Sequence, residues 1–228
     1  MFETDEFYAL RTGFAPRIGG ESNGSGIDLE LRISQLGRLR VTSGRVAAGS
    51  PRKLADPIPG DDRHESIAVF GPVEAGLHEV WLTLAAHSDD EAGLPAYLSL
   101  LFDDSPTATI EPWIAEGDTA APGHPADSFV YVDDSLLEVM DADTADDDAV
   151  AAVGEHLLHT QTAACIAPLP ASVVDDKVVV CRAKQGTYPV VATRNARGEV
   201  TGLHIDFAIV GPRSRKDWWK ARHIHAHP

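Results

Sequence analysis

The chain has 228 residues, and 43% of them are hydrophobic, which is enough to bury a core and excludes a disordered chain as the default expectation. Its formal net charge is -16, from 35 acidic and 19 basic residues. This charge opposes binding to nucleic acid or to an anionic membrane, because both need clustered Lys and Arg. It is compatible with a basic protein partner, or with acidic residues that serve only solubility.

The N-terminal residues lack the basic and apolar pattern of a secretory signal, and no apolar run approaches the roughly 18 residues that span a bilayer. We therefore expect a cytoplasmic protein that does not enter a membrane. Cys165 and Cys181 lie in apolar, strand-like contexts, which favours buried free thiols over a disulfide or a zinc site. The chain also lacks a phosphate-binding loop and a dinucleotide-binding fingerprint, so no cofactor is predicted.

The first half of the chain has the pattern of an arm followed by strands. Residues 1–26 carry aromatic side chains before a proline and several glycines, which predicts a docking arm and a loop. Residues 27–33 alternate between apolar and polar side chains, which is the period of a strand with one wet face. After a turn at Gly44 and a proline-rich loop, two longer apolar runs form a hairpin. The first β half is therefore predicted over 27–102.

The second half follows residues 103–127, whose Pro, Ala, Thr and Asp content is typical of a linker. A run rich in Ala, Val and Leu predicts one helix over 143–158, with carboxylates at its positive N-terminal end. Residues 177–210 then have the pattern of three strands joined by two turns. We place the second β half at 128–210 and a basic, aromatic tail at 211–228.

These elements predict a mainly β fold (a β-rich α+β fold) built from two related antiparallel sandwich-like halves with one intervening helix. The halves echo each other, since Gly76 and Gly186 each open a strand, a turn and a second strand. Duplication and coincidence both explain this echo, because any β protein contains several hairpins that begin with Gly.

Four segments of the second half resemble the C-terminal half of the bacterial DUF4241 family: 177–180, 186–190, 198–200 and 203–207. Shorter matches follow the same order at Ser43-Gly44-Arg45, Gly76 to Val80 and Val132-Asp133. The resemblance covers 37–210 and implies a soluble bacterial protein of about this length. It implies no activity, because the family is defined by sequence alone. Two of the family's turns are altered in this chain, at Arg182 to Gln185 and at Asp134.

Acidic residues form the first candidate site. Carboxylates from a turn, a strand end and a strand interior can hold a hard divalent cation or act as an acid–base pair. The candidates for this catalytic or metal-binding role are Asp133, Asp141 and Asp206, with Asp134, Asp143 and Glu199 as further members. No metal-loop spacing joins them, so each also has a structural interpretation. Asp206 could face outward on an edge strand, or it could accept hydrogen bonds from a turn.

Histidines form the second candidate site. His223, His225 and His227 alternate at the C-terminus and could chelate a transition metal. The segment offers no supporting second layer of hydrogen bonds, which favours incidental nickel or zinc affinity over a physiological site. His156 and His159 share a predicted helix face, but nothing supplies a third ligand.

The tail is the third candidate site, because its basic residues contrast with the acidic chain. It contains Trp218 and Trp219 together with Arg215 and Arg222, and these residue types dominate interface hot spots. It could clamp onto the chain's own acidic surface, onto a protein partner or onto another protomer of a homo-oligomer. A disordered end is the alternative.

The sequence contains no nucleophile elbow and no activated cysteine, so nucleophilic catalysis has little support. The leading hypothesis is a non-enzymatic binding or interaction protein of the bacterial cytoplasm. One version is an acidic immunity- or antitoxin-like protein that neutralises a basic partner. The alternative is a metal-assisted hydrolase that uses Asp133, Asp141 and Asp206.

Overall fold

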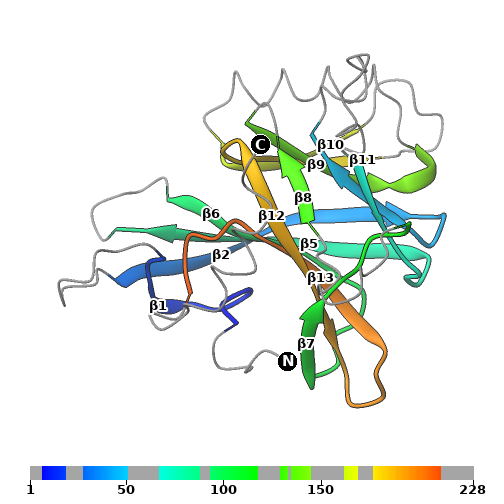
Figure 1. Ribbon diagram of the computed structural model, residues 1–228, viewed down its shortest axis with the longest axis horizontal. Coiled ribbons are helices and arrows are strands. Elements are labelled where there is room, and N and C mark those ends of the chain that lie inside the picture. The colour runs from blue at the N-terminus through cyan, green and yellow to red at the C-terminus, as the bar shows by residue number, and fades with distance from the viewer. Residues whose placement is uncertain are drawn as a thin grey trace.

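The computed structural model describes residues 7–18, 28–50, 67–87, 93–117, 129–132, 135–144, 162–168 and 177–211. Within these ranges the chain forms β-strands that assemble into two sheets (Figure 1), which confirms the prediction of a mainly β protein. The predicted helix over 143–158 lies almost wholly outside the described residues. Only its first residues are described, and they belong to the short 3-10 helix η2 (Ala142–Thr144).

The larger sheet has eight antiparallel strands and curls into half a barrel (Figure 1). Its order is β1-β2-β5-β6-β13-β12-β7. Off this path, β8 pairs with β12 at Gly186 to Pro189, whereas β7 pairs with it at Val191 to Arg194. The strands in that order are β1 (Gly13–Pro16), β2 (Asp28–Val41), β5 (Gly76–Ala86), β6 (Leu94–Leu101), β13 (Val200–Asp206), β12 (Gly186–Arg194), β7 (Thr109–Pro112) and β8 (Phe129–Val132).

The smaller sheet has five antiparallel strands in the order β10-β11-β9-β3-β4. These strands are β10 (Ala164–Pro168), β11 (Lys177–Arg182), β9 (Leu136–Asp141), β3 (Val46–Gly49) and β4 (Ile67–Phe70). All six residues of the central strand β9 are buried. A central strand with both faces covered is expected to be apolar on both faces, and Leu136-Leu-Glu-Val-Met140 follows this pattern except at Glu138.

Each sheet takes strands from both predicted halves of the chain. In the larger sheet β6 pairs with β13, and in the smaller sheet β3 pairs with β9. The predicted halves at 27–102 and 128–210 are therefore not two separate sandwich-like units. The reason is physical: alternation of side chains predicts that a segment is a strand, but it carries no information about which strand lies beside it.

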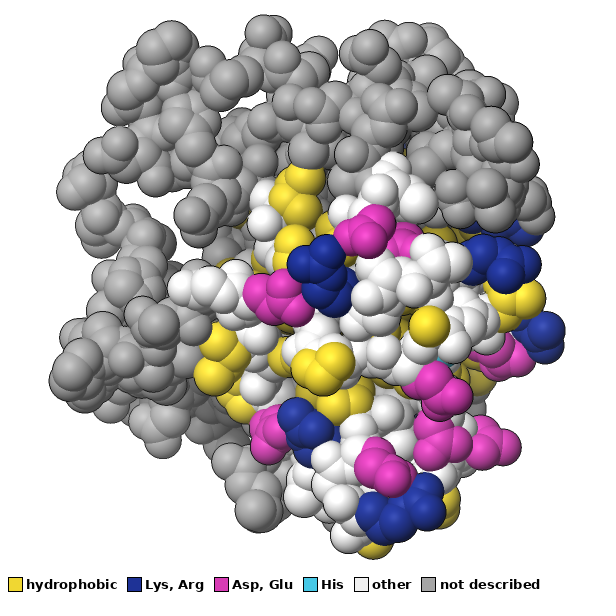
Figure 2. Space-filling view, turned by 90° about the vertical axis from the view of Figure 1, so that its right-hand side faces the viewer, with side chains coloured by type: hydrophobic (Ala, Val, Ile, Leu, Met, Phe, Trp, Pro, Cys, Tyr) yellow, Lys and Arg dark blue, Asp and Glu magenta, His cyan; other side chains and the backbone are white. Residues whose placement is uncertain are grey.

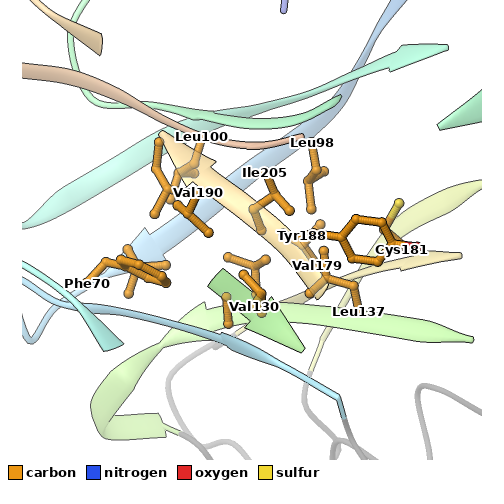
Figure 3. Close-up of a cluster of buried hydrophobic side chains, with 14 of the residues drawn as sticks. Phe70, Leu98, Leu100, Val130, Leu137, Val179, Cys181, Tyr188, Val190 and Ile205 are labelled. Atoms are coloured by element: carbon orange, nitrogen blue, oxygen red, sulfur yellow. The ribbon is translucent and has the colours of Figure 1, made fainter. Parts of the chain in front are cut away.

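The main core lies between the two sheets (Figure 3). The larger sheet contributes alternate residues such as Leu98, Val190 and Ile205, and the smaller sheet contributes Leu137 and Val179. Trp113 follows β7 and packs edge to face against Phe70 and Phe102, with ring centroids 6.0 and 6.1 Å away. Trp113 therefore fills part of the core.

The opposite face of the larger sheet is covered in part by the N-terminal arm. The backbone N–H of Leu10 donates a hydrogen bond to Oγ1 of Thr83, at 3.1 Å. The ring of Phe7 meets Tyr97 and His204 edge to face, at centroid distances of 5.6 and 4.9 Å. Because the arm covers this face, polar groups of β5, β6 and β13 are buried that would otherwise lie in water.

Candidate functional site

Asp141, the last residue of β9, is 2% exposed and is a structural hydrogen-bond acceptor. Thr42 and Ser43 both donate to its carboxylate from their backbone N–H groups and their hydroxyls. Burial favours a higher pKa for Asp141, but these hydrogen bonds outweigh burial and lower the pKa from its usual value. The carboxylate therefore fixes the turn at Gly44, where φ is 71°, between β2 and β3.

Asp206, the last residue of β13, is 4% exposed and lies on a central strand between β6 and β12. The prediction of an outward-facing edge position is therefore wrong. Its Oδ1 accepts a hydrogen bond of 2.7 Å from the backbone N–H of Ala208, which has a φ of 59°. The alternative prediction, that Asp206 accepts hydrogen bonds from a turn, is confirmed.

The structure does not bring the described members of the predicted acidic site together into one cluster. Asp141 lies at the end of the smaller sheet and Asp206 in the larger one, while Asp143 forms an ion pair with Arg45 at 2.7 Å. Glu199 accepts a hydrogen bond from Asn195 inside the β12–β13 turn. Across the described ranges, no three His, Cys, Asp or Glu side chains are grouped so that they could hold a metal ion.

Several predicted site residues lie outside the described ranges, and their predicted roles stay predictions. They are Asp133 and Asp134, the histidines His156, His159, His223, His225 and His227, and the tail residues Arg215, Trp218, Trp219 and Arg222. The two cysteines are described. Cys181 is a buried free thiol, as predicted, whereas Cys165 is a free thiol that is only half-buried.

Glu138 is the most unusual ionisable residue of the described chain. It lies in the middle of β9, is 1% exposed, and has no hydrogen-bond partner for either carboxyl oxygen among the described residues. Burial raises the pKa of Glu138 to about 9, so the side chain is a neutral carboxylic acid at pH 7. Strongly perturbed carboxyls are frequent at functional sites, which makes Glu138 a candidate.

The surroundings of Glu138 explain this pKa. Side-chain alternation places Glu138 with Leu136 and Met140 on the outer face of the smaller sheet, away from the main core. Val178 and Val180 of β11 and Ala47 of β3 belong to the same outer cluster. Among the described residues, the side chains that share this face with the carboxyl are apolar, and burial beside them stabilises its neutral form.

A second buried polar group joins three strands on the arm-covered face of the larger sheet. His204 of β13 is 1% exposed, and its Nε2 lies 3.1 Å from Oγ1 of Thr193 on β12. Its Nδ1 lies 2.9 Å from Oγ of Ser99 on β6. Burial lowers the pKa of His204 to about 3, so the ring is neutral at pH 7.

The Ser99–His204 pair has the atoms of a nucleophile and its base, but it lacks access to a substrate. Ser99 is 0% exposed, and the remaining nitrogen of His204 is taken up by Thr193. Thr201 in turn donates to Thr193 at 3.0 Å. A closed network of this kind satisfies buried polar groups and links neighbouring strands, so we assign it a structural role.

Sequence reasoning missed both Glu138 and His204 as distinctive residues. Glu138 was a recognisable exception, because a lone carboxylate interrupts the apolar run from Leu136 to Met140. His204 gave a weaker signal, since its position in β13 fits an ordinary polar residue on a wet face. Its burial depends on the N-terminal arm, nearly two hundred residues earlier in the chain.

No family model, no curated protein and no solved structure matches this chain. The resemblance to the DUF4241 family therefore stays a prediction from its motifs. In the described ranges, no helix is long and apolar enough to cross a membrane.

Proposed function

We propose that this protein is a non-enzymatic binding protein of the bacterial cytoplasm, which recognises a basic protein partner through acidic segments carried on a β framework. An immunity- or antitoxin-like protein that neutralises a basic toxin is the version we favour. The observation that supports this proposal is the way in which charge is divided along the chain.

The described framework is nearly neutral. It contains 13 of the 35 acidic residues and 11 of the 19 basic residues, so most of the acidic excess belongs to the other segments. On the face in Figure 2, the described Lys or Arg and Asp or Glu side chains lie next to one another. Several charged side chains of the framework form ion pairs with each other, including Arg45 with Glu116 and Asp143, and Arg194 with Glu111. The framework therefore offers little net charge, and the remaining segments supply the attraction for a basic partner.

The hydrolase alternative has no supporting observation. Asp141 and Asp206 act as acceptors for local backbone and hydroxyl groups in different sheets, and Asp133 lies outside the described residues. The possible homo-oligomer through the C-terminal tail also stays a prediction, because the tail residues are not described.

The test uses the protein encoded next to this chain's own gene as the first candidate partner. Binding is measured by calorimetry at 50 and 500 mM NaCl, and we expect affinity to fall by about tenfold or more, since salt screens exposed charges. Neutralising Asp146, Asp147 and Asp148 to Asn should weaken binding. The matched control neutralises Glu74, Asp103 and Asp104 of the framework and should change it little. A salt-independent complex, or equal effects of the two triple variants, contradicts the proposal.

A further inference from the structure

A row of polar side chains crosses the arm-covered face of the larger sheet. Apolar residues normally fill a buried sheet face, and polar residues normally mark a face that water reaches. The members of this row are only 0–3% exposed, and they are Thr83 of β5, Ser99 of β6, Thr193 of β12, and Thr201 and His204 of β13. The strands therefore carry the pattern of a wet face, but the fold covers that face.

The N-terminal arm meets this row at two described residues. The ring of Phe7 packs edge to face on the ring of His204, and the backbone N–H of Leu10 donates to the hydroxyl of Thr83. Ala9 lies between these two contacts and is 6% exposed. A ring contact and a side-chain hydrogen bond hold a segment less firmly than the hydrogen-bond ladder of a paired strand does.

Leu10 adds backbone strain to the docked arm. Its φ is 59°, which lies in the left-handed region, where a side chain is crowded by its own backbone. Such a conformation persists only where surrounding contacts hold it, and strained residues of this kind are frequent in switch segments. Separation of the Leu10 N–H from Thr83 would let the backbone return to an ordinary conformation.

β1 anchors the chain directly after this part of the arm. Gly13 to Pro16 pair with β2, and the N–H of Gly211 donates to the carbonyl oxygen of Pro16. Gly13 has a φ of 103°, which favours glycine, at the point where the ladder begins. Residues 7–12 can therefore lift about Gly13 while β1 keeps its place in the sheet.

We propose that residues 7–12 form a strap that lifts from the larger sheet when His204 takes up a proton, while β1 and the rest of the sheet stay folded. With the strap docked, Phe7 covers the ring of His204, and its two nitrogens face the hydroxyls of Ser99 and Thr193. With the strap lifted, water reaches the ring and solvates the imidazolium ion, which takes one proton from solvent. Protonation and lifting therefore favour each other.

The other ionisable groups around the ring are compatible with this coupling. Register places Asp206 of β13 across from Tyr97 of β6, and alternation puts Asp206 on the same face as His204. An acidic neighbour favours the imidazolium ion once the ring is wet. The strap itself carries Tyr8 and Arg11, whereas β12 presents Val191 and Thr193 to this face.

The test measures hydrogen exchange of the Leu10 amide by NMR on the full chain, from pH 7 to pH 5. The amide of Leu203 in the central strand β13 reports unfolding of the whole sheet. After correction for intrinsic rates, we expect Leu10 to exchange at least tenfold faster than Leu203, because the strap opens without the sheet. Its protection should fall about tenfold for each pH unit below 6.5, because the lifted state binds one more proton than the docked state.

Three variants make the test specific. Phe7→Ala removes the ring that covers His204, so it should lower the protection of Leu10 at pH 7 by about tenfold and move the NMR titration of the His204 ring toward pH 6.5. Phe14→Ala is the matched control, because Phe14 lies on β1 and is 72% exposed, and it should leave both unchanged. His204→Gln should remove the pH dependence of the Leu10 amide.

Three results would overturn the proposal. Equal protection of Leu10 and Leu203 would show that the arm leaves only when the whole sheet unfolds. Protection of Leu10 that does not change with pH, or an unchanged His204 titration in Phe7→Ala, would show that the strap and the ring are not coupled. Circular dichroism checks that each variant folds. The measurements on the wild type and on Phe7→Ala need no change at His204, so they decide the outcome even if His204→Gln does not fold.

Discussion

The Nδ1 atom of His204 lies 2.9 Å from the hydroxyl oxygen of Ser99, which links the central strand β13 to its neighbour β6 on the arm-covered face. Both side chains are fully buried, and Thr193 occupies the other nitrogen of the ring. Burial of the ring disfavours its charged imidazolium form. This has a direct effect on how the protein responds to acid.

Replacing His204 with Gln should make the protein less sensitive to mild acid. The pKa of His204 is lowered from 6.5 to about 3 by burial, so between these values the unfolded chain binds a proton that the folded chain does not. His204 therefore lowers stability by about 1.4 kcal/mol for each pH unit below 6.5. Urea unfolding at pH 7, 6, 5 and 4 gives the difference between variant and wild type. A difference that does not change with pH contradicts this assignment.

Replacing Glu138 with Gln should have the opposite dependence on pH. The pKa of Glu138 is raised from 4.5 to about 9, so between these pH values the folded chain keeps a proton that the unfolded chain releases. The wild type therefore has its full stability from this group below pH 4.5 and loses stability as pH rises toward 9. Relative to wild type, the variant should gain on the order of 1 kcal/mol per pH unit between pH 5 and pH 8. Urea unfolding across this range measures the gain, and the carbon NMR signal of the Glu138 carboxyl should titrate near pH 9. Titration near pH 4.5 would show that the carboxyl is solvated.

Replacing Gly202 with Ala should disrupt the His204 network. An added Cβ would lie 2.8 Å from Nε2 of His204, closer than real Cβ atoms approach, and 3.0 Å from Oγ1 of Thr193, which is also tight. We expect a loss of about 2 kcal/mol in the free energy of unfolding, since overpacked interiors usually lose this much. Gly76→Ala is the matched control, because its Cβ would meet only the ring of His78 at 3.5 Å. In a His204→Ala background the cost of Gly202→Ala should shrink, and equal costs in both backgrounds would rule out the clash.

Replacing Asp141 with Ala should destabilise the protein by about 2–3 kcal/mol, because the donors of Thr42 and Ser43 lose their acceptor. Asp143→Asn, two residues away, removes only an exposed ion pair with Arg45 and should change stability much less than Asp141→Ala does. Thermal and urea unfolding separate the two. The lowered pKa of Asp141 also means that its contribution is present at neutral pH and is lost only in acid below its usual range. Similar small losses for both variants would show that the turn does not depend on Asp141.

Local sequence signals predicted where strands form better than they predicted which strands pair with each other. The alternation over 27–33 indicated a strand, and β2 begins at Asp28. The turn signal at Asn195 to Gly198 indicated a hairpin, and β12 and β13 pair across it. The pairing of β6 with β13 had no local signal, because strand partners distant in the chain are selected by the packing of whole faces.

The candidate sites show the same limit for side chains. Asp206 was singled out for its carboxylate between apolar residues, and the structure shows an acceptor for the Ala208 turn. Glu138 has the same local pattern, with apolar residues on both sides, yet its carboxyl has no partner among the described residues. Sequence spacing cannot distinguish the environment of Asp206 from that of Glu138. The difference depends on backbone groups and strands that come near these side chains only in the folded chain.

The exchange of strands between the two sheets also determines when the chain can fold during its synthesis. β6 lacks one of its two neighbours until β13 has left the ribosome, and β3 lacks one of its two until β9 has done so. The first half of the nascent chain must therefore wait with open strand edges, which are templates for aggregation. Folding is expected to be largely post-translational and slow, since most of its closing contacts join distant parts of the sequence.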